Sequence, residues 1–256
     1  MTEEAIIESL QCFRPISLEE MDGLKLMNRM DNKFVFSVNE LPNVLKQASE
    51  HYHVLEINGQ REFFYLTKYM DTPDWFFFSE HQKGHADRYK IRMRTYEVNN
   101  QSFLEIKHKT NKGQTKKSRI KVQSTDALDD ECRKFIEEKT HRSADNLDFV
   151  SINGFTRITL ASFQTNERIT IDHNLSFSYG DKTVKLDHLC IAEVKKERSA
   201  SRTPIIDIMK NVHGLNTGLS KYCIGISYLH EDLKQNAFKP KKLLINKIER
   251  NEYFAS

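Results

Sequence analysis

The stretch Arg88-Tyr89-Lys90-Ile91-Arg92-Met93-Arg94 alternates cationic and apolar side chains. Successive side chains of a β-strand point to opposite faces, so the stretch predicts a strand with one cationic and one apolar face. The two strands predicted next along the chain repeat the pattern, with Glu105, Lys107 and Lys109 and then with Lys117, Arg119 and Lys121. We expect the three strands to form a meander in which the charged faces coincide.

A cationic strand face has an ordinary interpretation, in which lysine and arginine keep one side of an antiparallel sheet in water. That interpretation fits a single strand well. It fits three neighbouring strands poorly, because like charges on one face repel each other and an exposed face normally mixes in acidic residues or threonine. The repulsion is tolerated when a polyanion neutralises it, and arginine binds phosphate oxygens with two parallel hydrogen bonds.

The remaining elements are predicted from periodicity and capping. Helices are expected at 17–28, where Ser17 and Glu20 form a capping box, and at 39–50, 125–139 and 203–212. Strands are expected at 29–37, 53–58, 61–71, 87–98, 101–110, 115–123, 151–163, 167–172, 188–197 and 221–229. Turns are expected at Asn99-Asn100 and at residues 111–114.

Many antiparallel strands with few helices predict an α+β fold. Helices can cover the apolar face of the sheet from outside, which leaves the cationic face on the concave side. A closed sheet of about eight strands leaves room for one small ligand. We therefore expect an antiparallel eight-stranded β-barrel or tunnel with a cationic lumen and helices outside, in a single domain that spans residues 1–256 with its core at about 25–230.

Composition narrows the class of protein. The 256 residues contain 39 Lys+Arg and 36 Asp+Glu, a net charge of only +3, which argues against a nucleic-acid-coating protein. The four cysteines form no CxxC pair, so reduced thiols are expected. The sequence shows no signal peptide and no run of about 18 apolar residues. We expect a cytoplasmic protein without a membrane segment.

Several runs together resemble a known family. They are Tyr69-Met70-Asp71-Thr72-Pro73-Asp74, the stretch 88–94, Leu104-Glu105-Ile106-Lys107, Ile191-Ala192-Glu193-Val194-Lys195 and Leu219-Ser220-Lys221-Tyr222-Cys223-Ile224-Gly225-Ile226. Their order and spacing resemble the triphosphate tunnel metalloenzymes, which are also called CYTH-like proteins. Within that superfamily they are most similar to the vacuolar transporter chaperone (VTC) domain, the polyphosphate polymerase branch.

The resemblance implies roles for individual residues. The central cations would be Lys33, Arg92, Arg94, Lys107, Arg157, Arg168 and Lys221. Further phosphate contacts would come from Arg29, Arg88, Lys90, Lys109, Lys117, Arg119, Lys195 and Ser220. Glu193 would coordinate a divalent metal, Mn²⁺ or Mg²⁺.

One departure bears on the activity. Hydrolase and cyclase members of the superfamily open with Glu-x-Glu-x-Lys, whereas residues 29–33 read Arg-Met-Asp-Asn-Lys. This difference favours the polymerase branch and argues against a two-metal site. The implied activity is transfer of the ATP γ-phosphoryl group onto polyphosphate by a stand-alone domain of the bacterial type, and a membrane-protein partner stays open.

Two other functions stay open. One is hydrolysis of inorganic or nucleoside triphosphate in the same tunnel, and the other is binding of polyphosphate or inositol phosphates without catalysis. Nucleic acid is a weaker ligand class, because the aromatic residues lie mostly on the strand faces opposite the cations. Trp75-Phe76-Phe77-Phe78 is interpreted as a core or barrel-cap strand, His81 and His85 as loop residues, Asp71 as part of an Asx-turn, and 239–242 as a solvated basic tail.

Overall fold

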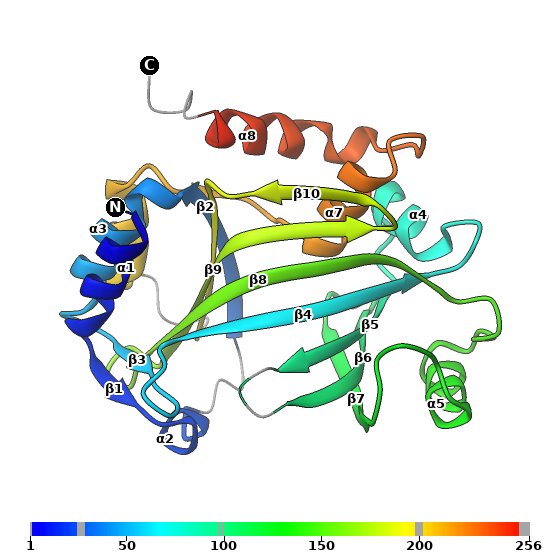
Figure 1. The fold of residues 1–256 in the computed structure, drawn as a ribbon, viewed down its shortest axis with the longest axis horizontal. Helices are drawn as coiled ribbons and strands as arrows, with labels where there is room; N and C mark the ends of the chain where they lie inside the picture. Colours follow the sequence, from blue (N-terminus) through cyan, green and yellow to red (C-terminus); the bar gives the residue numbers. More distant parts are fainter. Residues whose placement is uncertain (1, 25–28, 97, 99, 198–201, 251–256) are drawn as a thin grey trace.

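The computed structural model describes residues 2–24, 29–96, 98, 100–197 and 202–250 (Figure 1). Its centre is an antiparallel sheet of eight long strands. In spatial order these are β2 (Arg29–Ser37), β11 (Leu189–Glu197), β9 (Glu167–Tyr179), β8 (Asp148–Ser162), β4 (Glu62–Asp71), β5 (Arg88–Tyr96), β6 (Gln101–Lys109) and β7 (Thr115–Val122). The α+β class and the antiparallel tunnel-type fold predicted from the alternation are confirmed.

Short strands extend the long ones. They are β12 (Leu215–Asn216) beside β2, β10 (Lys182–Leu186) beside β9, β3 (His53–Leu55) beside β8, and β1 (Arg14–Ile16) parallel to β3. The hydrogen-bonded path ends at β12 and β7. In the described part of the chain the tunnel is therefore a curved sheet with two edges and not a barrel closed by hydrogen bonds.

Three helices cover the outer face of β2, β11, β9 and β8. They are α1 (Thr2–Gln11), α3 (Leu41–Ala48) and α6 (Pro204–Asn211). In α3 the buried residues are Leu41, Val44, Leu45 and Ala48, the spacing of one helical face. They pack on apolar side chains of the sheet such as Phe34 and Ile171. The apolar outer wall expected from the sequence lies here.

The other helices lie near the β5–β7 meander or at one end of the sheet. Helix α4 (Phe76–Lys83) contacts β5, and α5 (Asp130–Thr140) contacts β6 and β7. Helix α7 (Lys221–Leu229) contacts β8 and β9, and α8 (Lys239–Glu249) contacts β2 and β11. The remaining short elements are α2 (Leu18–Asp22), η1 (Val38–Glu40) and η3 (Asn236–Phe238). None of the helices in the described ranges has the length and apolar character that crossing a bilayer requires.

Several boundaries differ from the expectation. The helix expected at 17–28 is α2, and its start is capped by the predicted capping box of Ser17 and Glu20; residues 25–28 lie outside the described part. The strand expected at 53–58 ends at Leu55, and the strand expected at 167–172 continues to Tyr179. The turn at 111–114 is confirmed by a bond from Thr110 N to Gln114 O, whereas Asn99 is not described.

Three local predictions are wrong. Residues 221–229 form helix α7 and not a strand. The prediction failed because the helix is buried on nearly all sides, so its apolar residues do not form the single stripe by which a helix is recognised in a sequence. Residues 76–78 begin helix α4, which also contains His81, so the interpretation of that histidine as a loop residue fails. Lys239 to Lys242 open helix α8 and are not a solvated tail.

Candidate anion-binding site

The register of the sheet brings the predicted cations onto one concave face. Arg92 lies opposite Glu105, and Lys107 lies between Lys90 on β5 and Lys117 on β7. The side chains alternate as the sequence predicts, since Ile91, Met93, Leu104 and Ile106 are buried in an apolar cluster on the other face. Arg92 and Arg94 are each only 7% exposed, so these guanidinium groups do not extend into bulk water.

A buried carboxylate holds the β5–β7 part of this face together. Glu105 is fully buried, and its Oε2 accepts hydrogen bonds from Arg92 Nε at 2.8 Å and Nη2 at 2.6 Å. The ammonium group of Lys117 forms an ion pair with the other oxygen of Glu105. Burial alone would raise the pKa of Glu105, but the charges of Arg92, Arg94 and Lys117 lower it to about 2. Glu105 is thus ionised at neutral pH.

A second buried carboxylate joins the sheet to helix α7. Asp172 on β9 accepts bonds from Arg157 of β8, at 2.5 Å from Nε and 2.8 Å from Nη2, and forms an ion pair with Lys221. Burial would raise the pKa of Asp172, but Arg157 and Lys221 hold it well below its usual range. The family pattern does not mark Asp172. Its alternation with Arg168 and Thr170 is the sequence signal that places it on this face.

The third carboxylate is Glu193, the residue predicted to coordinate metal. It lies on β11 opposite Lys33, and Lys33 Nζ is 2.7 Å from Glu193 Oε1. Burial works against ionisation, but nearby Lys195, Lys33 and Lys107 lower the pKa of Glu193. Lys107 belongs to β6, far from β11 in the order of the sheet. The sheet therefore curls until β6 and β11 face each other across the concave side.

Other cations on this face have no carboxylate within ion-pair distance in the described part of the chain. Lys107 lies close to other cations. The positive charge of Arg92, followed by burial, lowers the pKa of Lys107 to about 6, although the negative charge of Glu193 opposes part of this shift. Burial also lowers the pKa of Lys195, to about 8, with Glu193 opposing the shift and Arg168 adding to it. Arg94 donates to Thr67 Oγ1 at 3.0 Å. These groups crowd together, and none of the three has an ion-pair partner of its own among the described residues.

Two residues that sequence reasoning missed also lie here. The hydroxyl of Tyr69 on β4 is 3.2 Å from Arg92 Nη1. Burial would raise the pKa of Tyr69, but Arg92, Arg94 and Lys90 lower it. Thr170 Oγ1 is buried and has no hydrogen-bond partner in the described residues. Tyr69 is two residues from Thr67 on β4, and Thr170 is two residues from Asp172 on β9. The alternation of strand faces could therefore have placed both residues on the concave face.

The remaining predicted residues have more varied surroundings. Lys109 is exposed, Arg119 lies over the ring of Phe103 at 4.7 Å, and Arg88 donates to the carbonyl of His85. Arg168 is half-buried opposite Lys195. Ser220 caps α7 and accepts a 2.8 Å bond from Lys90. Arg29 begins β2, but its side chain lies outside the described part.

The carboxylates of the concave face suit a metal ion that binds together with the phosphates of a substrate. In the described residues no group of three His, Cys, Asp or Glu side chains could hold a metal ion. Glu105 and Asp172 are each engaged by two cations, whereas Glu193 forms one ion pair, with Lys33. Mg²⁺ and similar ions at phosphate sites are commonly held by one or two carboxylates together with substrate phosphates. Glu193 could serve in that way.

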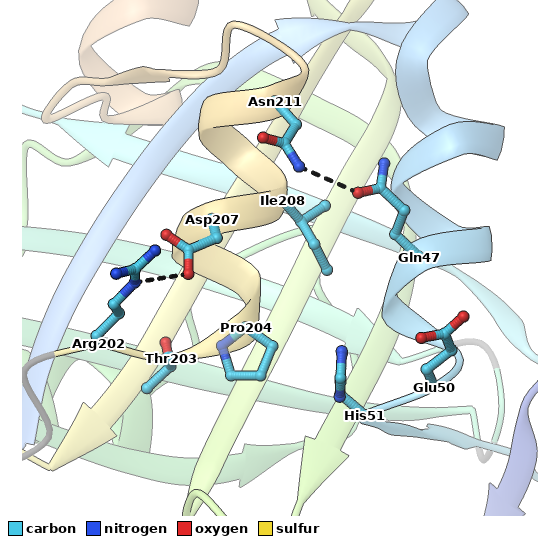
Figure 2. Close-up of a pocket in the computed structure, with 9 residues that line it drawn as sticks. All are labelled: Gln47, Glu50, His51, Arg202, Thr203, Pro204, Asp207, Ile208 and Asn211. Atoms are coloured by element: carbon cyan, nitrogen blue, oxygen red, sulfur yellow. Dashed lines mark hydrogen bonds and ion pairs between the residues drawn. The ribbon is translucent and has the colours of Figure 1, made fainter.

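A pocket elsewhere contains none of the predicted residues. It measures about 540 Å³ and lies between α3 and α6, lined by residues such as His51, Arg202 and Asp207 (Figure 2). Arg202 and Asp207 form an ion pair there, with Nε 2.8 Å from Oδ2. This pocket is on the outer side of the sheet, so it is separate from the concave face.

Comparisons with known proteins agree with this geometry. The sequence matches the family model of the VTC domain over residues 28–230. A search of curated protein sequences finds no match to the chain.

The chain is also similar to solved structures. A candidate adenylyl cyclase from Hippeastrum, described as having a dominant triphosphatase activity, is 13% identical with a TM-score of 0.52; the match covers 79% of this chain and 97% of that chain. A candidate adenylate cyclase from Vibrio parahaemolyticus is 11% identical with a TM-score of 0.46. The match covers 78% of this chain and 99% of that chain. The match to the family model covers most of the sequence, and the chain therefore belongs to the VTC-domain family.

Proposed function

We propose that the chain is a metal-dependent phosphotransferase that moves the γ-phosphoryl group of ATP onto the end of a polyphosphate chain. The observation that carries the proposal is the excess of cations on the concave face. Three carboxylates are engaged in ion pairs there, while Lys90, Arg94, Lys107 and Lys195 have none within the described residues. Polyanions with closely spaced charges would neutralise that excess.

The reaction requires little covalent help from the protein. A terminal oxygen of polyphosphate attacks the γ-phosphorus, the bond from that phosphorus to the β–γ bridging oxygen breaks, and ADP leaves with the bonding electrons. Donor and acceptor are both anions, so positioning and charge neutralisation dominate catalysis. A bound Mn²⁺ or Mg²⁺ at Glu193 would neutralise charge on the phosphate oxygens.

We assign roles to individual residues as the resemblance to the VTC domain implies them. We assign the reacting phosphates to the central cations: Lys33, Arg92, Arg94, Lys107, Arg157, Arg168 and Lys221. We assign the rest of the chain or the nucleotide phosphates to Arg29, Arg88, Lys90, Lys109, Lys117, Arg119, Lys195 and Ser220. Tyr69 and Asp172 would hold Arg92 and Arg157 in place.

Incubation with ATP and Mn²⁺ tests the proposal, with polyphosphate separated on gels and ADP and free phosphate quantified. We expect ADP and long-chain polyphosphate in wild-type protein and neither in Arg92→Ala. Lys182→Ala is a matched control, because Lys182 is exposed on β10 and pairs with Glu231. Free phosphate without polyphosphate would contradict the polymerase assignment and indicate a triphosphatase, the activity described for the Hippeastrum protein. Tight triphosphate binding without turnover would indicate a binding module.

A further inference from the structure

The pocket between α3 and α6 has no part in the proposed function. Its volume of about 540 Å³ lies within the range of roughly 300–1,000 Å³ that small-molecule sites occupy. Figure 2 shows the apolar side chains of Pro204 and Ile208 between two polar walls, one on each helix. A ligand that combines charged groups with an apolar part suits that arrangement.

The α3 wall of the pocket is negative. Glu50 and His51 line it directly after α3, whose last residue is Ala48. The C-terminus of a helix carries a partial negative charge, and the carboxylate of Glu50 has no ion-pair partner in the described ranges. No group of three His, Cys, Asp or Glu side chains in those ranges could hold a metal ion. The wall therefore suits an ammonium group.

The α6 wall is positive. Arg202 Nε lies 2.8 Å from one carboxylate oxygen of Asp207, and Lys210 Nζ lies 3.9 Å from the other, so two cations share one carboxylate. The N-terminus of α6 adds a partial positive charge. Carboxylates bind at helix N-termini, and arginine can hold a carboxylate with two hydrogen bonds. This wall therefore suits a carboxylate.

A buried hydroxyl group on the α6 wall lacks a hydrogen bond. Thr203 occupies the N-cap position of α6 and lines the pocket, but its side chain makes no capping bond. The residue is only 3% exposed, and its Oγ1 has no partner in the described part of the chain. Buried polar groups are nearly always hydrogen-bonded in folded proteins. A ligand carboxylate at the start of α6 would accept the bond that Thr203 lacks.

Hydrogen bonds from the surrounding structure hold both walls in place. Asn211 Nδ2 of α6 donates to Gln47 Oε1 of α3 at 3.4 Å (Figure 2). The backbone N–H of Ile205 donates to the hydroxyl of Tyr52 at 3.2 Å, and that hydroxyl donates to the buried carboxylate of Glu167 at 2.7 Å. The start of α6 is thus anchored to β9. A preformed site of this kind requires little ordering when a ligand binds.

We propose that this pocket binds a free amino acid with an apolar side chain. The ammonium group lies at Glu50, and the carboxylate lies at Arg202 and Thr203. The side chain packs on Pro204 and Ile208. The ligand class is a zwitterion because the two walls carry opposite charge. The inference is independent of the proposed function, since none of these residues lies on the concave face.

Saturation-transfer NMR on the wild-type protein tests the proposal, with L-leucine, L-methionine and L-phenylalanine as probes. We expect at least one of them to bind with a Kd of about 1 mM or tighter. Its N-acetyl derivative lacks the ammonium group and its methyl ester lacks the carboxylate, so each should bind at least about tenfold more weakly. The cations of the concave face would instead favour the N-acetyl derivative, which is an anion. Equal or tighter binding of that derivative would therefore overturn the proposal.

Variants locate the site. Glu50→Gln and Thr203→Val should each weaken the binding by about tenfold, whereas Glu138→Gln, at an exposed position on α5, should leave it unchanged. Thr203→Val removes a buried hydroxyl that lacks a partner, so its Tm without ligand should not fall; a lower Tm would show that this hydroxyl is bonded within the protein and would contradict its assigned role. If none of the three amino acids binds, or if Glu50→Gln binds as wild type does, the proposal fails and the proposed function is unaffected.

Discussion

Asp71 at the end of β4 and Tyr222 in the first turn of α7 share a hydrogen bond of 2.7 Å, although 151 positions separate them in the sequence. The carboxylate of Asp71 also accepts hydrogen bonds from the backbone N–H groups of Thr72, Phe77 and Phe78, each at 2.9 Å. One buried carboxylate therefore begins helix α4 and fixes the start of α7. This is more than the Asx-turn expected for Asp71.

The first prediction concerns this junction. Tyr222→Phe removes one donor and should lower the free energy of unfolding by about 1 kcal/mol. Asp71→Asn should cost more, about 2–4 kcal/mol, because one of its two acceptor oxygens becomes an NH₂ group that faces N–H or O–H donors. Urea unfolding measures both. Tyr179→Phe is the control, since Tyr179 is 46% exposed; an equal loss there would contradict the assigned role.

The sequence predicts the charged strands of the concave face better than it predicts helix α7, for a physical reason. On strands such as β5 and β6, alternation assigns each residue to a face, and one buried face fixes the register. Arg92, Lys107 and Glu193 were expected on the concave face, and the structure places them there. Their functional roles stay predictions.

Helices α4 and α7 show where the sequence signal ends. The segment 221–229 is rich in aromatic and β-branched residues and is buried on nearly every side, so it carries the composition of a strand and no helical stripe. Ser220, whose hydroxyl accepts from Cys223 N, was the available sign of a helix start. Phe76 to Phe78 mislead in the same way, because the side chains that accept their N–H bonds, Thr72 for Phe76 and Asp71 for the other two, precede them by several positions.

The second prediction concerns acid stability. The pKa of Glu105 lies near 2 in the folded protein, against an ordinary value of 4.5. A lowered carboxyl pKa gives stability that is present above pH 4.5 and is lost as the pH falls toward 2. Glu105→Gln should therefore be less stable than wild type at pH 7, by roughly 3 kcal/mol, and should lose less on acidification. Urea unfolding between pH 3 and 7 tests this.

Glu138→Gln provides the comparison for that series. Glu138 is exposed on α5 and pairs with Lys139 at 2.6 Å, so its replacement should leave the acid profile unchanged. Parallel pH profiles for wild type and Glu105→Gln would show that Glu105 contributes nothing to acid stability.

The third prediction concerns the pH dependence of triphosphate binding. The pKa of Lys107 is lowered to about 6 and that of Lys195 to about 8, so both lose protons within the range of ordinary buffers. A bound polyanion favours the protonated forms, so binding above pH 6 takes up protons and the affinity falls as pH rises. Each proton taken up lowers the affinity by up to about tenfold per pH unit.

Lys107→Arg isolates one of these protons, because arginine stays charged. Titration calorimetry in buffers of different ionisation enthalpy should show less proton uptake for Lys107→Arg than for wild type at pH 8. The comparison also cancels the titration of triphosphate itself. Identical proton uptake in the two proteins would rule out Lys107 as the group that titrates.

The fourth prediction concerns Glu193. Glu193→Gln removes one negative charge beside Lys33 and Lys107, so metal-free triphosphate should bind at least as tightly as it binds to wild type. Turnover that depends on Mn²⁺ should fall by about 100-fold or more, if Glu193 holds the ion at the phosphates. Glu197→Gln, four residues further along β11 on the same strand face, is the control. Unchanged metal dependence in Glu193→Gln would exclude its assigned role.

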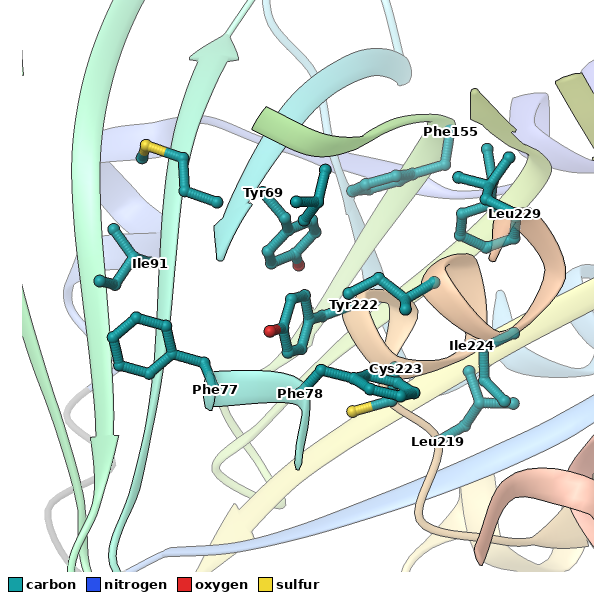
Figure 3. Packing of buried hydrophobic residues seen from close by; sticks show 14 of the residues in the cluster. Tyr69, Phe77, Phe78, Ile91, Phe155, Leu219, Tyr222, Cys223, Ile224 and Leu229 are labelled. Atoms are coloured by element: carbon teal, nitrogen blue, oxygen red, sulfur yellow. The ribbon is translucent and has the colours of Figure 1, made fainter. Parts of the chain in front are cut away.

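The fifth prediction tests how closely α7 packs against β9, beside the apolar cluster that Figure 3 shows. Alanine normally favours a helix interior over glycine by about 1 kcal/mol. At Gly225 the new Cβ would lie 2.7 Å from Phe177 and 3.2 Å from Ser151 Oγ, so we expect Gly225→Ala to destabilise by about 1–3 kcal/mol instead. Gly218→Ala is matched, because nothing lies within 4 Å of a Cβ there, and should be nearly neutral. A stabilised Gly225→Ala protein would mean that α7 is not packed closely against β9.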